Sequence, residues 1–114
     1  YVASGSNEYS SSSSALADRL YINDGTGQFL KSDQVLPAGL YESTSTVKVS
    51  DFDADGDQDL FVGVRSKPFF YGSPQNGYLL RNNGKGQFEN VTAAMASGLL
   101  KVGMITDAAW ADLD

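Results

Sequence analysis

The sequence predicts an all-β fold built from four-stranded antiparallel units, and three observations carry that prediction. An acidic loop, residues 51–59, lies between two segments of β-branched and apolar residues. A second pair of such segments follows and is joined by an Asn-Gly turn, which is typical of hairpins. The same order of segments and turns occurs twice in the chain, about sixty residues apart. We therefore expect repeated units rather than one continuous sheet.

The acidic loop has the composition of a calcium site. Aspartates occupy alternate positions around Gly56, namely Asp51, Asp53, Asp55, Asp57 and Asp59. Like charges this close repel one another unless a divalent ion compensates them. Calcium takes roughly six to eight oxygen ligands and is the natural candidate, with Gly56 allowing the sharp bend. The alternative is a solvated acidic turn that binds ions only loosely.

The loop differs from an EF-hand, because the twelfth residue is Val62 where that motif needs a glutamate. The ring of ligands must therefore close earlier. We expect carboxylates from positions 1, 3, 5 and 9 and the backbone carbonyl of Asp57 at position 7. The flanking segments Thr46–Val49 and Leu60–Val64 are strand-like, so the loop is expected to join two strands.

Composition excludes several classes of function. The formal net charge is −6, and removing the five loop acids together with Asp112 and Asp114 changes it to −6 + 7 = +1. No basic stripe remains for nucleic acid. The chain has no cysteine and no histidine, which excludes disulfides, thiolate sites and His-based catalysis. No apolar run approaches the roughly 20 residues of a membrane helix, so no membrane insertion is expected.

An internal repeat defines the units. Residues 20–29 match residues 79–88 at an offset of 59, with six of ten positions identical, and residues 49–53 match residues 110–114 at an offset of 61. The turns Asp24-Gly25 and Asn83-Gly84 predict hairpins between the third and fourth strands of each unit. Four strands at a regular period suggest the blades of a β-propeller.

The repeat gives the expected boundaries. Residues 1–44 form a partial blade, residues 45–103 a complete blade with the loop 51–59, and residues 104–114 the first strand and truncated loop of a third. Between the units, residues 90–98 predict a helix of one or two turns, with Thr92 as N-cap and Gly98 as its stop. Since a blade buries its faces against neighbours, we expect adjoining blades of the same parent chain or self-association.

The loop 51–59 with residues 60–63, and the segment 78–92, resemble the FG-GAP/VCBS repeat family, which includes the integrin α-subunit propeller and repeats of the bacterial ASPIC/UnbV-associated type. The resemblance implies a β-propeller and calcium. It assigns side-chain ligation to Asp51, Asp53, Asp55 and Asp59 and carbonyl ligation to Asp57. Asp112 and Asp114 match the first two ligands of a possible partial site. An extracellular, cell-surface or periplasmic location is also implied.

The rim of the blades opposite the calcium loop is expected to meet a partner. Long connections gather there, and one of them carries Phe69, Phe70 and Tyr71, which could bind a carbohydrate or a protein. The alternative is that these aromatics fold back over the core. We expect a calcium-binding module rather than an enzyme, because the carboxylates are concentrated in the metal motif. The alternative function is a non-catalytic portion of a propeller-type polysaccharide-degrading enzyme.

Overall fold

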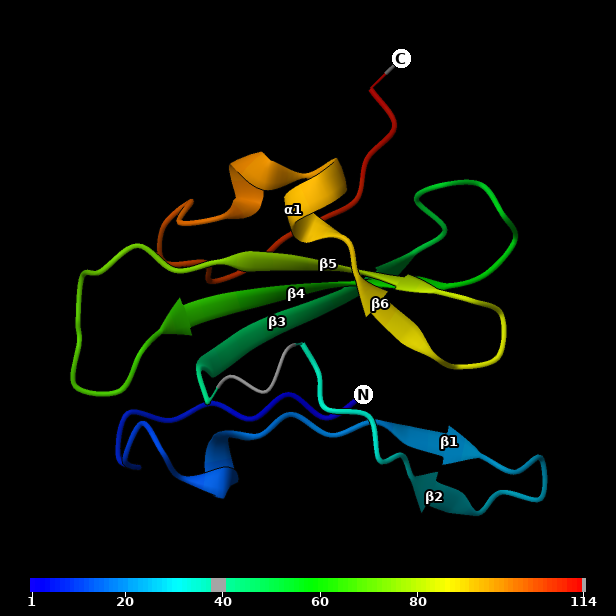
Figure 1. Cartoon of the computed structure of the whole chain (residues 1–114), viewed down its shortest axis with the longest axis horizontal. Helices are drawn as coiled ribbons and strands as arrows, with labels where there is room; N and C mark the ends of the chain where they lie inside the picture. The colour runs from blue at the N-terminus through cyan, green and yellow to red at the C-terminus, as the bar shows by residue number, and fades with distance from the viewer. Residues whose placement is uncertain (38–40, 114) are drawn as a thin grey trace.

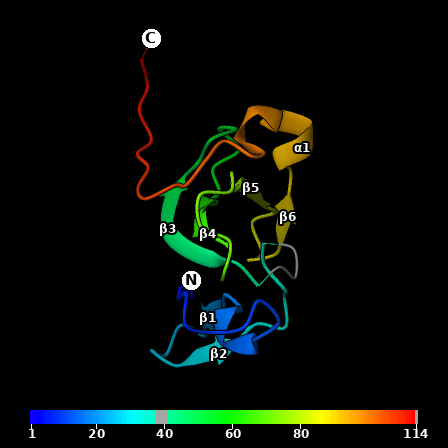
Figure 2. The same ribbon diagram turned by 90° about the vertical axis from the view of Figure 1, so that its left-hand side faces the viewer.

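The computed structural model describes residues 1–37 and 41–113, and it is an all-β structure with two antiparallel sheets. Figure 1 shows a four-stranded sheet in the middle, a smaller N-terminal unit against one of its faces, and a short helix with the C-terminal segment over the other. The view turned by 90° in Figure 2 shows the same three layers. The predicted fold class is confirmed.

The larger sheet is a meander of four strands in sequence order. Its strands are β3 (Ser43–Ser50), β4 (Asp59–Ser66), β5 (Gly77–Asn82) and β6 (Phe88–Asn90), and each pairs antiparallel with the next. The register places Val62 opposite Val47 on one side and opposite Tyr78 on the other. This is the four-stranded unit that the sequence predicts. The two strands beside the acidic loop, β3 and β4, are longer than the predicted segments Thr46–Val49 and Leu60–Val64.

The smaller sheet is the hairpin of β1 (Tyr21–Asn23) and β2 (Phe29–Lys31). Both hairpins turn at the predicted glycines, since Gly25 and Gly84 have φ of +85° and +76°, a region that glycine enters at low cost. A bridge between Val2 and Arg19 adds the N-terminal residues to this unit. Residues 1–31 therefore repeat, in shorter form, the arrangement of β4, β5 and β6.

The core lies between the two sheets. Alternate residues of β4 and β5 point toward the N-terminal unit and are buried: Leu60, Val62, Val64, Tyr78 and Leu80. Leu20 and Leu36 pack against them from the other side, with Tyr1 at the edge. Each fully buried aliphatic or aromatic side chain stabilises the fold by about 1.5–3 kcal/mol. The period of two along the strands thus produces one apolar face for the neighbouring unit.

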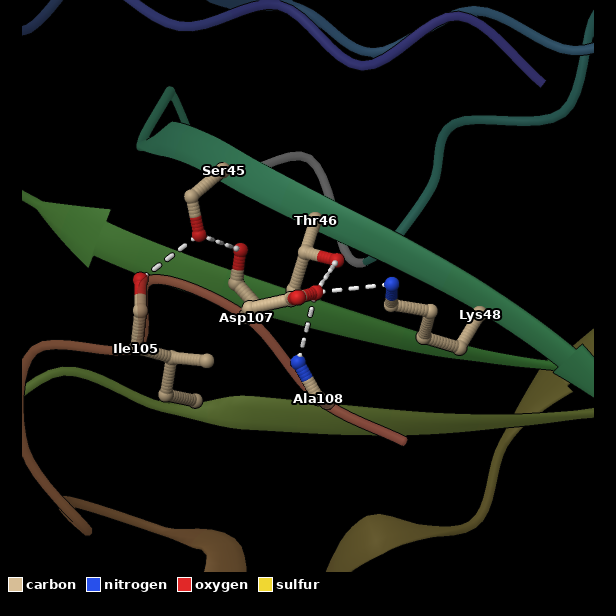
Figure 3. Close-up of polar contacts among 7 residues, drawn as sticks. Ser45, Thr46, Lys48, Ile105, Asp107 and Ala108 are labelled. Carbon is tan, nitrogen blue, oxygen red and sulfur yellow. Dashed lines mark hydrogen bonds and ion pairs between the residues drawn. The ribbon is translucent and has the colours of Figure 1, made fainter. Parts of the chain in front are cut away.

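The opposite face of the larger sheet receives the C-terminal segment. Ile105 lies over Gly63 and Gly77, where an added Cβ would be 2.7 Å and 3.3 Å from its side chain. Figure 3 shows how the segment is held: Ser45 Oγ donates to the carbonyl of Ile105 at 2.6 Å, and the Asp107 carboxylate meets Thr46 and, at 2.7 Å, the Lys48 ammonium group. The two glycines allow this close approach.

The contact between units is itself repeated. Thr44 N donates to Ser4 O at 3.2 Å, and Ile105 N donates to Val64 O at 3.1 Å. Residues 1–4 (Tyr-Val-Ala-Ser) resemble residues 61–64 (Phe-Val-Gly-Val) at an offset of 60, which aligns Ser4 with Val64, and the offset of 61 aligns Thr44 with Ile105. The C-terminal segment therefore starts on the larger sheet as β3 starts on the N-terminal unit.

The strand predicted within 104–114 is not formed in the described part of that segment, residues 104–113. A strand requires a neighbouring backbone for its ladder, and these residues lie across the sheet instead of beside a strand edge. The boundaries of the three units remain predictions.

The predicted helix is present but its ends differ. It consists of α1 (Thr92–Met95) and a 3₁₀ turn, η2 (Ser97–Leu99), so Gly98 lies inside the second turn and does not stop the first. The N-cap is Val91, and the prediction of Thr92 as N-cap is wrong. The hydroxyl of Thr92, 1% exposed, instead accepts from Leu79 N at 2.8 Å and donates to Asn90 Oδ1 at 2.7 Å. The Thr92 hydroxyl therefore bonds to β5, which is distant in sequence, and does not cap the helix.

Two rims result from this topology. The loops 24–28, 51–58 and 83–87 lie at one end of the strands in Figure 1, and the loop 67–76 lies at the other end with residues 5–13. We call the first the acidic rim and the second the aromatic rim. The arrangement agrees with the one expected for antiparallel blades.

Candidate functional site

The acidic loop connects β3 to β4 and is shaped by two residues with positive φ. Gly56 has φ of +95°, as its expected role in the bend requires. Ala54 also lies in the left-handed region, at φ +60°, which the sequence does not indicate because alanine rarely adopts it. The loop therefore curls twice within a few residues.

Hydrogen bonds from the backbone hold this curl. The Asp51 carboxylate accepts from Asp55 N at 3.1 Å and from Gly56 N at 3.0 Å. The Asp55 carboxylate accepts from Asp57 N at 2.9 Å. Carboxylates that accept backbone N–H groups in a turn fix the chain around themselves. Asp51 is consequently placed at the centre of the loop.

Three of the five predicted ligands come together. Asp51, Asp53 and Asp59 each offer one carboxylate oxygen, and these oxygens lie within 4.8 Å of one another. Calcium binds oxygen at about 2.3–2.6 Å, so two ligands on opposite sides of the ion are about 4.6–5.2 Å apart. The spacing therefore fits one calcium ion, and the hard, anionic oxygens are the ligands that it prefers. Asp55 and Asp57 lie outside this cluster, and their ligand roles remain predictions.

Electrostatics favours a cation at this cluster. Two unit charges separated by about 4.8 Å repel by about 3 kcal/mol at an effective dielectric constant of about 20 and by about 1 kcal/mol in water, and the exposure of Asp53 places its pairs near the lower figure. The cluster contains three such pairs, and neither of the ion pairs among the described residues, Lys48–Asp107 and Arg81–Glu89, involves a loop carboxylate. A divalent ion would replace this repulsion by attraction.

Asp59 links the loop to the sheet. Its side chain is fully buried, and its two oxygens accept from Phe52 N at 3.2 Å and from Asn82 N at 2.7 Å. The loop 83–87 lies close by, since a Cβ on Gly84 would be 2.6 Å from Asp57 Oδ2. One carboxylate thus takes part in the cluster and fixes the relation of loop, β4 and β5.

The second predicted site is only partly described. Asp112 is exposed, and Asp114 lies outside the described residues, so the possible partial site remains a prediction. Nearby, Trp110 stacks on Phe52 of the acidic loop, with ring centroids 6.3 Å apart and planes 5° from parallel. The single tryptophan of the chain therefore stacks on the acidic loop.

The predicted aromatic residues lie on the aromatic rim and point away from the core. Phe69, Phe70 and Tyr71 are 74%, 59% and 84% exposed. The alternative that they fold back over the core is therefore wrong. The preceding residue, Pro68, is fully buried, so the loop is anchored while its aromatic rings remain accessible.

Sequence reasoning missed a buried carboxylate at the junction of the two units. Asp18 accepts from Tyr1 Oη at 2.9 Å, from Ser4 N at 2.7 Å and from Thr44 Oγ1 at 2.8 Å. Burial raises its pKa above the usual range, although the three hydrogen bonds act in the opposite direction. The repeat aligns Asp18 with Gly77, so no second acidic residue marked this position in the sequence.

Comparison with curated proteins finds no match, and comparison with solved structures finds none. No helix in the described part of the chain is long and apolar enough to span a bilayer. A family model described as an FG-GAP-like repeat matches residues 1–62, a span that includes the whole acidic loop. Such repeats are structural, non-catalytic modules of β-propeller-type proteins and occur in extracellular and cell-surface proteins. The match covers more than half of the chain, which therefore belongs to the FG-GAP-like repeat family.

Proposed function

We propose that this chain is a calcium-stabilised repeat module of an extracellular, cell-surface or periplasmic protein, and that its aromatic rim binds a protein or a carbohydrate. The observation that carries the proposal is the cluster of Asp51, Asp53 and Asp59, whose oxygens lie within 4.8 Å of one another at the turn between β3 and β4. Calcium there has a structural role, and the module itself houses no catalytic step.

The stabilisation by calcium follows from mass action. Extracellular modules bind calcium with a Kd of about 10⁻⁴–10⁻³ M, so millimolar calcium stabilises the folded state by about 0.4–1.4 kcal/mol per site. The ion would connect the loop to β4 through Asp59, and Asp59 is already bonded to β5 through Asn82 N. Its effect therefore extends beyond the turn to the pairing of strands.

A neighbouring blade is the natural partner for the outer face of the larger sheet. An apolar groove of about 300 Å³ lies there, and its lining includes Phe61, Leu79, Leu99 and Trp110. The face that meets the N-terminal unit shows how such a surface is covered within this chain. We propose that an adjoining blade of the parent chain, or a second copy, covers the groove.

Thermal unfolding tests the calcium proposal. The full chain is melted in calcium, in magnesium and in EDTA, with circular dichroism and Trp110 fluorescence as readouts. The expected result is a higher midpoint in calcium than in EDTA, with magnesium less effective because it demands a smaller octahedral site. The variant Asp53→Asn should lose the calcium effect, whereas Asp33→Asn, outside the loop, should retain it. Equal midpoints in all three conditions would contradict the proposal.

A further inference from the structure

The aromatic rim carries two adjoining hollows. The first, of about 220 Å³, is lined by Asn7, Ser66, Lys67, Phe69 and Tyr71. The second, of about 320 Å³, shares Asn7 and is lined otherwise by Arg65 and by small, mostly polar residues: Gly5, Ser6, Ser43, Thr44, Ser45 and Thr106. Ser66 Oγ donates to Asn7 Oδ1 at 2.8 Å, which ties the loop 5–13 to the end of β4. The two hollows together form what we call the rim groove.

The backbone at the aromatic end of the rim groove forms a closed turn with exposed rings. Phe69 has φ of +66°, a conformation that is strained for an aromatic residue, and Phe70 N donates to Lys67 O at 3.0 Å to close the turn. Strain at an exposed position is typical of functional loops. Exposed aromatic rings suit the flat C–H faces of sugar rings, and an aromatic side chain has few rotatable bonds to order on stacking.

The charges of the rim groove are opposite to that of the chain. The net charge is −6, yet Arg65 and Lys67 are exposed here, and neither takes part in the two ion pairs found among the described residues. The Lys67 ammonium group lies 5.7 Å from the centroid of the Phe70 ring, so the cation and the aromatic surface are adjacent. An Arg guanidinium matches a carboxylate or sulfate with two parallel hydrogen bonds. The groove is thus complementary to an anion.

We propose that the rim groove binds an acidic oligosaccharide. A sugar ring stacks on Phe69 and Tyr71, and carboxylate or sulfate groups meet Lys67 and Arg65. Hydroxyl groups of the sugar bond to Asn7 and donate to the hydroxyl oxygens of the second hollow, of which those of Thr44 and Ser45 already donate within the chain. The hydroxyl side chains and the Asn7 amide beside aromatic rings favour a sugar over an acidic peptide, because a sugar presents a ring face for stacking and hydroxyl groups for hydrogen bonds, whereas an acidic peptide presents mainly carboxylates. This proposal rests on the proposed function, because it names the ligand class of the aromatic rim.

Binding measurements on the full chain in calcium test the proposal. The probes are hexasaccharides of hyaluronan, which carries carboxylates only, and of chondroitin sulfate, with neutral maltohexaose and hexaglutamate as comparisons. We expect either acidic sugar to bind at least about tenfold more tightly than both comparisons at physiological ionic strength. The two acidic sugars distinguish carboxylate from sulfate recognition. Binding of hexaglutamate as tight as that of the sugars would overturn the proposal.

Variants locate the binding. Tyr71→Ala should lower the affinity for the acidic sugar by about tenfold, because the stacking contact is lost. The double variant Arg65→Gln and Lys67→Gln should remove the preference for acidic over neutral sugar, whereas Lys31→Gln with Lys85→Gln, which changes the net charge equally, should leave it unchanged. Equal weakening by both charge variants would show non-specific attraction and overturn the proposal.

The outcome is separable from that of the calcium proposal. If no sugar binds while calcium still raises the melting midpoint, only the proposal for the rim groove is overturned. Sugar binding that persists in EDTA, without any calcium effect on the midpoint, supports the rim groove and contradicts the calcium proposal.

Discussion

Replacing Asp59 by alanine tests the claim that one carboxylate both completes the cluster proposed to bind calcium and holds the acidic loop to the sheet. The side chain is fully buried and accepts from Phe52 N and Asn82 N. Asp53 is a matched control, because it belongs to the same cluster but is exposed and, in the described structure, accepts no hydrogen bond. The two variants therefore separate the structural role from metal binding.

The expected magnitude follows from the lost hydrogen bonds. In EDTA, Asp59→Ala leaves two backbone N–H groups without their acceptor, at about 1–3 kcal/mol each. The free energy of unfolding should therefore fall in the absence of calcium, by at most about 2–6 kcal/mol, because removing one charge from the repulsive cluster offsets part of the loss. Asp53→Ala should not lower the free energy of unfolding in EDTA and should raise it slightly, since it removes an exposed, solvent-screened charge from a repulsive cluster. Both variants should lose the calcium-dependent gain.

Urea unfolding at several calcium concentrations is the appropriate assay. Circular dichroism reports the sheet, and Trp110, stacked on Phe52, reports the loop. The reasoning is refuted if Asp59→Ala unfolds in EDTA within about 0.5 kcal/mol of the unmodified chain. It is also refuted if Asp53→Ala is equally destabilising there, because the anchoring role would then not belong to Asp59.

Three further predictions concern the scaffold. Because burial raises the pKa of Asp18 above 3.8, its contribution to the free energy of unfolding is fully present below pH 3.8 and is lost as the pH rises through the raised pKa. In EDTA, the free energy of unfolding of the unmodified chain minus that of Asp18→Asn should therefore fall over this interval, and a difference that does not change with pH would contradict the prediction. Thr92→Val should lower the free energy of unfolding by about 1–3 kcal/mol, because Leu79 N loses its acceptor, while Thr92→Ser keeps the hydroxyl and most of the stability; equal losses in urea titrations would argue against this role. Gly63→Ala should lower the free energy of unfolding by about 1–3 kcal/mol, since its Cβ would lie 2.7 Å from Ile105 Cγ2. Adding Ile105→Ala to the same chain should recover part of this loss. Gly98→Ala is the control and should leave the free energy of unfolding nearly unchanged, because the space around Gly98 is open.

Local chemistry made much of the fold predictable. The Asp24-Gly25 and Asn83-Gly84 turns define their hairpins through residues that accept positive φ, and both hairpins form as expected. The acidic loop lies between two strands because β-branched and apolar residues surround it on both sides. These signals recur about sixty residues apart, so the order of the strands can be predicted from the sequence alone.

The sequence alone could not predict the long-range contacts. Thr92 has the residue type and position of an N-cap, but its hydroxyl is taken by Leu79 N on a neighbouring strand. The burial of Asp18 depends on Thr44, which lies 26 residues away in sequence. Spacing alone could also not show that Asp51, Asp53 and Asp59 approach one another, whereas Asp55 lies outside the cluster and accepts from Asp57 N. Such choices depend on how the loop meets β5.

Calorimetric titration of calcium into the full chain, previously stripped with EDTA and dialysed, measures the central claim most directly. The account predicts saturable calcium uptake with a Kd of about 10⁻⁴–10⁻³ M, abolished or strongly weakened in Asp53→Ala. Absence of heat and of any Trp110 fluorescence change over millimolar calcium would contradict it, as would unchanged uptake by the Asp53→Ala variant.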